Sequence, residues 1–382
     1  MTRGERLATL GRGAATLMLA MGLGRFAFTA LLPEMQAAAR FSDAEAGLMA
    51  SLNLAAYLGG VIWAGRARPE ARASLLRLAL GGAVVAIAAM GLPLGVLGWD
   101  AVRILAGATS GLLFVLATAF VLESGAALGP SGAALHFAGV GTGIAFSGLV
   151  AATIGDWRAG WGVLALVGLA LAVAGHGLPG RRATAAATGT AARVSMRWSA
   201  VFVVLAAAYA LEGYGYIVSG TFLVAILRRL PETAGLAPYA WVLAGLAAIV
   251  SPVVWSRAAH RFGAWRALAL AYAIQAVGIA APLTETVGGA LFSAASFGFT
   301  FIGITGVSIG LAARLQPGAT GAATAAITVG YGVGQVVGPW SAGVLAGSGG
   351  GFAVPLVLAA GAVAVSAAAS LGGDLLARRG TA

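Results

Sequence analysis

Two ionisable side chains lie in the middle of long apolar runs, where a charge is energetically unfavourable. Arg25 ends the segment Gly-Leu-Gly-Arg at 22–25, and Glu212 begins the segment Glu-Gly-Tyr-Gly-Tyr at 212–216. A guanidinium keeps its proton in a protein, so Arg25 needs an anion, carbonyl oxygens or water beside it. A desolvated carboxyl favours its neutral form and is suited to carry a proton. Ionisable groups inside a membrane-spanning segment indicate a functional site.

The spacing of these two segments predicts how the charges are placed in space. The segments lie 191 residues apart in a chain of 382. At this offset Tyr216 matches Arg25, and Glu212 matches Met21, which is one helical turn from Arg25. Since residues four apart on a helix share a face, we expect Arg25 and Glu212 to face one central cavity from equivalent helices. The alternatives are a structural ion pair or a surface-reaching side chain for Arg25, and a packing contact for Glu212.

Several other polar residues in the apolar runs are candidates for a substrate or proton pathway. Arg103 is a third charged candidate, and an interfacial i,i+3 pair with Asp100 is its alternative. For the uncharged candidates, hydrogen bonds between helices are an equally good explanation. These uncharged candidates are Tyr216, Thr29, Asn53, Tyr57, Gln275 and Gln335.

The composition indicates a protein that is solvated by lipid. Sixty per cent of the residues are apolar and 9% are charged, whereas soluble domains carry about 25% charged residues. The 59 glycines suit close packing of membrane helices. The net charge of +11 comes from arginines in short clusters between apolar runs, which argues against a nucleic-acid partner. The chain has no cysteine, no phosphate-binding loop and no zinc-type histidine cluster, so we expect no cofactor and no metal.

Apolar runs of about 18 to 25 residues recur along the chain, the length that a helix needs to cross a bilayer. The first run exceeds the apolar core of a signal peptide, so we interpret it as a retained span. Ser42 with Glu45 predicts a capping box at the start of the second span. Asp100 is predicted to cap the fourth span, and Pro238 is predicted to lie in the first turn of the eighth. The predicted spans are 13–32, 44–65, 75–97, 100–122, 133–154, 160–178, 200–226, 238–256, 266–284, 287–311, 320–346 and 352–373.

The arginines predict the orientation of these twelve spans. Seventeen of the 23 fall on the side of the two termini, four fall in the opposite loops and two lie within spans. By the positive-inside rule both termini are cytoplasmic, although the loop between spans 4 and 5 has no arginine. The longest loop, at 179–199, is rich in Ala, Thr, Gly and Arg and suggests a flexible linker. We therefore expect six-helix bundles at 1–178 and 200–382.

The offset of 191 recurs in other spans. Gly143 in span 5 matches Gly334 in span 11, and Gly107 in span 4 matches Gly298 in span 10. A parallel repeat of six spans is an architecture of secondary transporters, whose substrate site lies between the repeats near the membrane midplane. The fold class expected is thus all-α integral membrane, with 12 transmembrane helices in two pseudo-symmetric bundles.

The sequence resembles the major facilitator superfamily, and within it the YbfB/YjiJ branch. The Arg103 and Gly107 pattern of the superfamily's fourth span is present, whereas the turn at 65–70 lacks the superfamily's usual Asp. A Gly-Pro element is absent from span 5, which weakens a drug-antiporter interpretation. The segments that carry the resemblance are GLGRFAFTALLPEM at 22–35, SDAEAGLMASLNLAAYLGG at 42–60, RILAGATSGLLFVLA at 103–117, FAGVGTGIAFSG at 137–148, EGYGYIVSGTFLVA at 212–225 and GYGVGQVVGPWSAG at 330–343.

The resemblance implies transport of a small molecule across the bacterial inner membrane by alternating access, driven by an ion gradient. We expect a monomeric, non-enzymatic secondary transporter that is proton-coupled through Glu212, with efflux as one direction of transport. Arg25 would balance charge or bind substrate. The alternatives are a uniporter or a sodium-coupled carrier and, from other classes, an intramembrane transferase or a receptor. The sequence does not identify the substrate.

Overall fold

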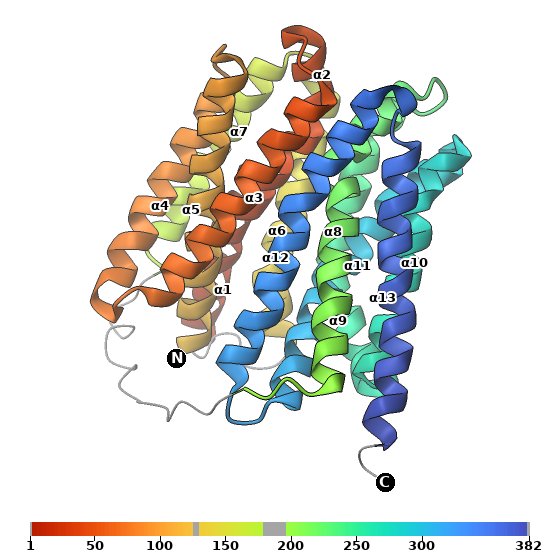
Figure 1. Cartoon of the computed structure of the whole chain (residues 1–382). Helices are drawn as coiled ribbons and strands as arrows, with labels where there is room; N and C mark the ends of the chain where they lie inside the picture. The colour runs from red at the N-terminus through yellow and green to blue at the C-terminus, as the bar shows by residue number, and fades with distance from the viewer. Residues whose placement is uncertain (1, 125–129, 179–195, 380–382) are drawn as a thin grey trace.

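The chain forms a bundle of long helices in the computed structural model, which describes residues 2–124, 130–178 and 196–379 (Figure 1). These ranges contain no β-strand. The predicted linker at 179–199 lies outside the described residues apart from its last four positions. The first helices are α1 Arg3–Leu17, η1 Met18–Phe26, α2 Ala27–Ala39, α3 Asp43–Arg66, α4 Pro69–Met90, α5 Gly95–Glu123, α6 Pro130–Thr153 and α7 Trp157–His176. They are followed by α8 Ala200–Arg229, η2 Ala234–Leu236, α9 Ala237–Phe262, α10 Ala264–Ala280, η3 Ala281–Thr284, α11 Val287–Leu315, α12 Thr320–Leu345, η4 Ala346–Gly350 and α13 Ala353–Arg379.

The lengths of these helices fit a membrane-spanning bundle. A helix rises about 1.5 Å per residue and needs about 20 residues to cross the hydrocarbon of a bilayer. Within the described ranges, eleven helical segments are long and apolar enough to do so, and α1, η1 and α2 together form the first of them. The twelfth, α12, has the length but is not among these eleven, and its apolar residues are interrupted by glycines, Gln335 and Pro339. The predicted all-α membrane architecture is confirmed.

Local signals predicted some helix boundaries correctly and others wrongly. The capping box of Ser42 and Glu45 and the first-turn position of Pro238 are confirmed. The predicted third span at 75–97 is wrong at its end, because α4 stops at Met90 and a turn leads to α5. Asp100 is not a cap, because α5 begins five residues earlier, at Gly95. Apolar residues continue through this turn, so the hydropathy pattern does not mark it.

The helices gather in two groups, and both chain termini lie at the same end of the bundle (Figure 1). We call α1 to α7 the N-half, α8 to α13 the C-half, and the end of the bundle away from the termini the distal end. Within the N-half α3 packs on α5, and within the C-half α9 packs on α11. The halves meet where α3 packs on α12 and where α6 packs on α9. The first helix also packs on α8 through α2.

Glycine pairs at the 191-residue offset form equivalent helix crossings in the two halves. A Cβ added at Gly143 would lie 2.6 Å from Gly22 Cα, and one added at Gly334 would lie 3.2 Å from the Gly213 carbonyl carbon. A Cβ at Gly107 would lie 2.0 Å from the Asn53 carbonyl oxygen. At its repeat partner, Gly298, the equivalent distance to the carbonyl of Ala244 is 1.8 Å. These backbones touch because no side chain separates them. The crossings support the repeat.

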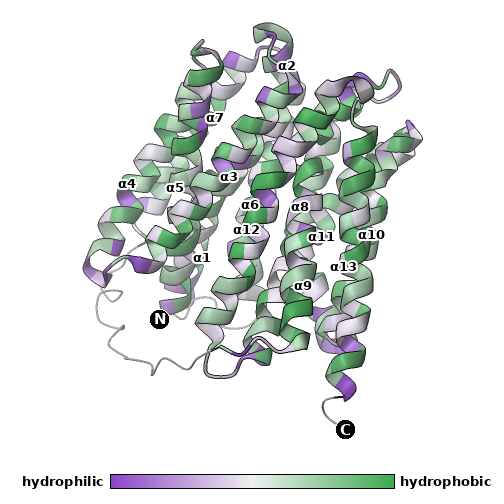
Figure 2. Cartoon of the chain, viewed as in Figure 1, coloured by the Kyte–Doolittle hydropathy of each residue, from purple (hydrophilic) through white to green (hydrophobic). Residues whose placement is uncertain are grey.

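The outer surface of the bundle is apolar across its middle. Hydrophobic residues cover the lipid-facing sides of the helices, and strongly hydrophilic residues are concentrated at the two ends (Figure 2). Large side chains such as Leu78, Leu166 and Val173 are each at least 70% exposed. Exposed apolar side chains over this height are favourable only in hydrocarbon. The polar residues of the spans are instead buried between helices, and these form the candidate site.

Candidate functional site

Arg25 lies where the two halves meet. It belongs to the π-helical segment η1, a geometry that often marks functional sites, and it is 6% exposed. Its Nη2 donates a hydrogen bond to the Tyr216 hydroxyl of α8 at 2.9 Å. One turn along, the Thr29 hydroxyl donates to the carbonyl of Gly220. Each contact joins residues 191 positions apart, so equivalent positions of the two halves contact each other directly.

Arg103 from α5 is the second buried guanidinium of the junction. It is 2% exposed, its Nη1 donates to the Gly24 carbonyl at 3.1 Å, and its Cζ lies 4.7 Å from the ring centre of Phe28. The Asn53 amide donates to the Arg103 carbonyl at 2.9 Å. The side chain reaches across to the first helix and forms no ion pair with Asp100, so the alternative of an interfacial i,i+3 pair does not apply.

A small cavity lies at this junction, with room for about one water molecule. Both guanidiniums line it, and the structure thereby brings together four of the predicted site residues. Tyr57 lies nearby, with its ring centre 5.3 Å from Arg25 Cζ. The polar lining residues are Arg25, Thr29, Asn53, Arg103 and Thr221; the others are Phe26, Phe28, Ala50, Leu54, Ile217 and Gly220.

Glu212 is buried inside the C-half and does not line this cavity, so the prediction that Arg25 and Glu212 face one cavity is wrong for this structure. Neither carboxyl oxygen makes a hydrogen bond of normal geometry with the described residues. The Gln275 amide lies alongside the carboxyl. Its Nε2 donates to the Thr300 hydroxyl at 2.9 Å, which leaves Gln275 Oε1 without a donor among the described residues.

Four tyrosines lie within electrostatic reach of Glu212, and one of them, Tyr216, is hydrogen-bonded to Arg25. The Tyr216 hydroxyl accepts hydrogen bonds from both Arg25 and the Gln335 amide. The Tyr216 ring stacks on Tyr331 with ring centres 5.6 Å apart. Tyr216 is therefore hydrogen-bonded to Arg25 and lies within electrostatic reach of Glu212. The tyrosines within electrostatic reach of Glu212 are Tyr209, Tyr216, Tyr272 and Tyr331.

Three of these tyrosines were not among the predicted site residues. Tyr209 precedes Glu212 by three positions, and Tyr331 precedes Gln335 by four, so both share a helix face with a predicted residue. That spacing is a signal in the sequence. Tyr272 likewise lies three positions before Gln275, on α10. A search for polar residues one turn from each candidate would have found all three.

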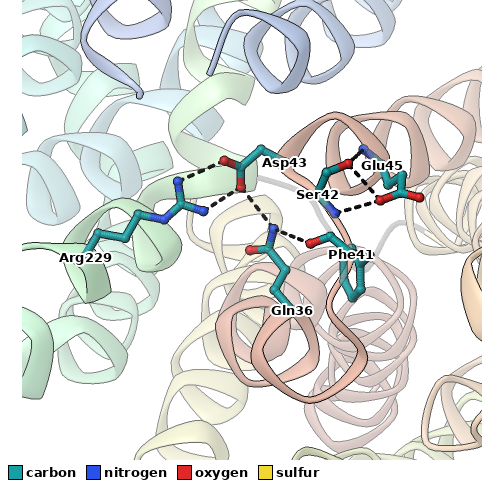
Figure 3. Close-up of polar contacts among 6 residues, drawn as sticks. All are labelled: Gln36, Phe41, Ser42, Asp43, Glu45 and Arg229. Carbon is teal, nitrogen blue, oxygen red and sulfur yellow. Dashed lines mark hydrogen bonds and ion pairs between the residues drawn. The ribbon is translucent and has the colours of Figure 1, made fainter. Parts of the chain in front are cut away.

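The distal end carries contacts that close the two halves against each other. Arg229 of α8 makes two hydrogen bonds to Asp43 of α3, at 2.9 and 2.6 Å, and Gln36 donates to the same carboxylate at 3.0 Å (Figure 3). Next to this pair, Arg228 forms an ion pair with Glu34 of α2. Both ion pairs join the N-half to the C-half. We call these two pairs the distal ion pairs.

Glycine and proline close the same end through backbone contacts. A Cβ added at Gly47 of α3 would lie 2.3 Å from the Pro339 carbonyl oxygen of α12. At the equivalent position, a Cβ on Gly148 of α6 would lie 3.0 Å from the Pro238 carbonyl oxygen of α9. These two contacts are related by the 191-residue offset. The Ser51 hydroxyl adds a hydrogen bond to the Val336 carbonyl at 2.6 Å.

Ion pairs at the end that holds the termini join helices of one half. Arg72 of α4 pairs with Glu123 of α5 at 3.0 Å, and Arg266 of α10 pairs with Asp374 of α13 at 3.2 Å. The two ends therefore differ: the ion pairs described at the distal end join the two halves, whereas those described at the end with the termini join helices within one half.

Two six-span halves that meet at a polar centre define a multi-pass membrane transporter of the major facilitator type. The sequence profile described as "Uncharacterised MFS-type transporter YbfB" matches residues 17–371. The chain belongs to this family, as the resemblance implied, and the family is one of transporters and not of enzymes. No curated protein sequence matches the chain.

Solved structures share the fold at low sequence identity. A nucleoside transporter, NupG, in its D323A mutant form, superposes with a TM-score of 0.75 and 12% identity, covering 96% of this chain and 99% of that one. A D-xylose–proton symporter gives a TM-score of 0.73 and 13% identity over 97% of both chains. A bacterial homolog of the human lysosomal transporter Spinster, inward-facing and occupied, gives 0.72 and 15% over 98% of both. At these identities the similarity establishes the fold alone.

Proposed function

We propose that this protein is a proton-coupled secondary transporter of a small molecule that works by alternating access. The family and the fold support transport. The cavity lies between the halves, where a parallel repeat places a substrate site. Within the described ranges the ion pairs that join the halves lie at the distal end, which suits a protein that opens alternately at its two ends.

The burial of the Glu212 carboxyl is the main observation that supports proton coupling. It is completely buried and has no ion pair with any described residue, and the groups within its electrostatic reach include four phenols and the Gln275 amide. A buried carboxylate without a cation is strongly disfavoured, so the neutral, protonated form suits this environment. Glu212 would take up and release its proton as solvent reaches it from alternate sides.

Tyr216 and Gln335 would link the proton to the cavity. The Tyr216 hydroxyl is hydrogen-bonded to Arg25 in the N-half and to Gln335 in the C-half. It also interacts with Glu212. A change of charge at Glu212 would therefore alter the electrostatic environment of the Arg25–Tyr216 hydrogen bond, one of the contacts between the halves. The D-xylose–proton symporter offers a precedent for proton coupling on this fold.

The proposed setting is the bacterial inner membrane, with both termini in the cytoplasm. The arginine distribution supports this orientation. The distal end then faces away from the cytoplasm, and the structure corresponds to a state that is closed on that side. The six-span halves at 1–178 and 200–382 would move as the two units of a monomer, joined by the segment 179–199.

The experiment uses the purified full chain in liposomes that contain a trapped pH-sensitive dye. D-xylose, uridine, benzoate and a quaternary ammonium compound are added in turn, with and without an imposed pH gradient. We expect at least one compound to move with protons, and Glu212→Gln to lose this coupling while it keeps its fold. Glu285→Gln, which changes an exposed distal carboxyl, serves as the control.

The alternative mechanisms give different results in this assay. A uniporter would move substrate without a change of internal pH, and a sodium-coupled carrier would respond to a sodium gradient. If Glu212→Gln transports and responds to pH like the unmodified protein, the role assigned to Glu212 is wrong.

A further inference from the structure

The central cavity contains two permanent positive charges and no carboxylate. Arg25 and Arg103 both line it, and Glu212 does not. Neither guanidinium forms an ion pair with any described carboxylate: Arg25 is bonded to a phenol and Arg103 to a backbone carbonyl. The two side chains interact with each other electrostatically. Two buried cations that repel one another require a compensating anion.

Hydrogen-bond donors remain free at the same place. The Nε atoms of Arg25 and Arg103 are buried and have no acceptor among the described residues. Nε and a neighbouring Nη of one guanidinium form the planar fork that matches the two oxygens of a carboxylate. If the arginines served only to pack the helices, their donors would be expected to find protein acceptors, as buried polar groups generally do.

The remainder of the cavity wall limits the kind of anion that fits. Phe26, Phe28, Leu54 and Ile217 make part of the wall apolar, and Thr29 and Thr221 add hydroxyls. The Phe26 and Phe28 rings lie 4.9 and 4.7 Å from the guanidinium carbons of Arg25 and Arg103. Such a wall favours a molecule with a charged head and a small apolar body. The cavity, which here has room for about one water molecule, would have to widen as the halves move in order to admit it. A proton on Glu212 would also balance the charge of a monoanion, so the pair would cross the membrane without net charge.

We infer that the substrate is a small organic monocarboxylate, held by Arg25 and Arg103 through its carboxylate and by the aromatic wall through its apolar body. This inference rests on the proposed transport function and specifies its substrate class. The two arginines of the N-half bind the anion, and the carboxyl of the C-half carries the proton.

The test measures binding to the detergent-purified full chain at neutral pH, by thermal shift and by calorimetry. The probes are benzoate and isovalerate, their amides benzamide and isovaleramide, and benzylamine as the cation. We expect a carboxylate to bind about 10-fold or more tightly than its amide, because the amide has no charge for the two guanidiniums. Arg25→Gln and Arg103→Gln should each weaken carboxylate binding about 30-fold or more.

Further variants separate recognition from folding. Arg25→Lys keeps the charge without the planar fork and should fall between the unmodified protein and Arg25→Gln. Arg266→Gln removes an arginine that pairs with Asp374 far from the cavity and should bind like the unmodified protein. A melting curve without ligand shows whether each variant is folded.

Three results would overturn the inference: equal binding of amides and carboxylates, unchanged carboxylate binding in folded Arg25→Gln and Arg103→Gln, or no carboxylate-specific shift with any probe. The liposome assay keeps this failure distinct from failure of the proposed function. Proton-coupled movement of an uncharged or cationic compound would leave the transporter assignment intact and refute the carboxylate. Carboxylate binding without proton-coupled transport would support the carboxylate site and refute the proposed proton-coupled function.

Discussion

Loss of the distal ion pairs is expected to shift the protein toward a state that is open at the distal end. Arg229 contacts Asp43 through two hydrogen bonds, and the Asp43 side chain is 11% exposed. Arg228 and Glu34 are 39% and 18% exposed. Exposed ion pairs contribute about 0.2–1 kcal/mol each, and a two-bond arginine pair lies at the upper end. Together the two pairs favour the closed distal end by about 1–2 kcal/mol, a factor of roughly 5–30 in population.

The absence of cysteine from the sequence makes this shift measurable. Spin labels at Ala38→Cys of α2 and Glu232→Cys after α8 lie on exposed positions of the two halves at the distal end. Pulsed electron resonance then gives the distribution of distances between them. We expect Asp43→Asn and Arg229→Gln to increase the longer-distance population several-fold. Because both remove the same contact, the double variant should add little to either.

Salt provides an independent check on the same reasoning. Partly exposed ion pairs weaken as ionic strength rises, so high salt should lengthen the mean distance in the unmodified protein and have less effect in the double variant. Distance distributions that are identical in all four proteins, at low and at high salt, would refute a role of these pairs in holding the distal end closed.

Two glycine substitutions give further predictions. Gly47→Ala places a Cβ 2.3 Å from the Pro339 carbonyl oxygen, so the same spin-label measurement should show a larger opening than loss of the ion pairs, whereas Gly59→Ala on the same helix, with nothing within 4 Å, should resemble the unmodified protein. Gly107→Ala overpacks a crossing inside the N-half, so it should lower the unfolding temperature in detergent by an amount equivalent to about 1–3 kcal/mol, with no such loss in Gly81→Ala.

Features encoded over short distances in the chain were predictable. The capping box at Ser42 and Glu45 depends on residues three apart, and it forms as expected (Figure 3). The repeat was also accessible, because two halves with one fold keep the same spacing. It matched Arg25 with Tyr216, and the structure places these two side chains in contact.

Features that depend on packing between distant helices were not predictable. The i,i+3 spacing suggested Asp100 as a partner for Arg103, but the acceptor is the Gly24 carbonyl, 79 residues away. The ion pair of Arg229 with Asp43 spans 186 residues. In the sequence, Arg229 is an ordinary basic residue at the end of a span. No local pattern predicts that it pairs with a carboxylate in the other half.

The two halves share their backbone geometry and differ in their chemistry at matched positions. Position 25 carries a guanidinium in the N-half, and its counterpart in the C-half is the phenol of Tyr216. The buried carboxyl, Glu212, has the uncharged Met21 as its counterpart. The two guanidiniums and the buried carboxyl thus belong to different halves, and Tyr216, which is hydrogen-bonded to Arg25, lies within electrostatic reach of Glu212. Any movement of the halves against each other must change the interaction between them. In the proposed mechanism the substrate binds one half, the proton binds the other, and a contact between the halves changes when they move. Such an arrangement satisfies the physical requirement for energetic coupling. In the proposed mechanism, this difference in chemistry between the halves would make the movement of substrate depend on the proton, which a repeat with identical chemistry in both halves would not do.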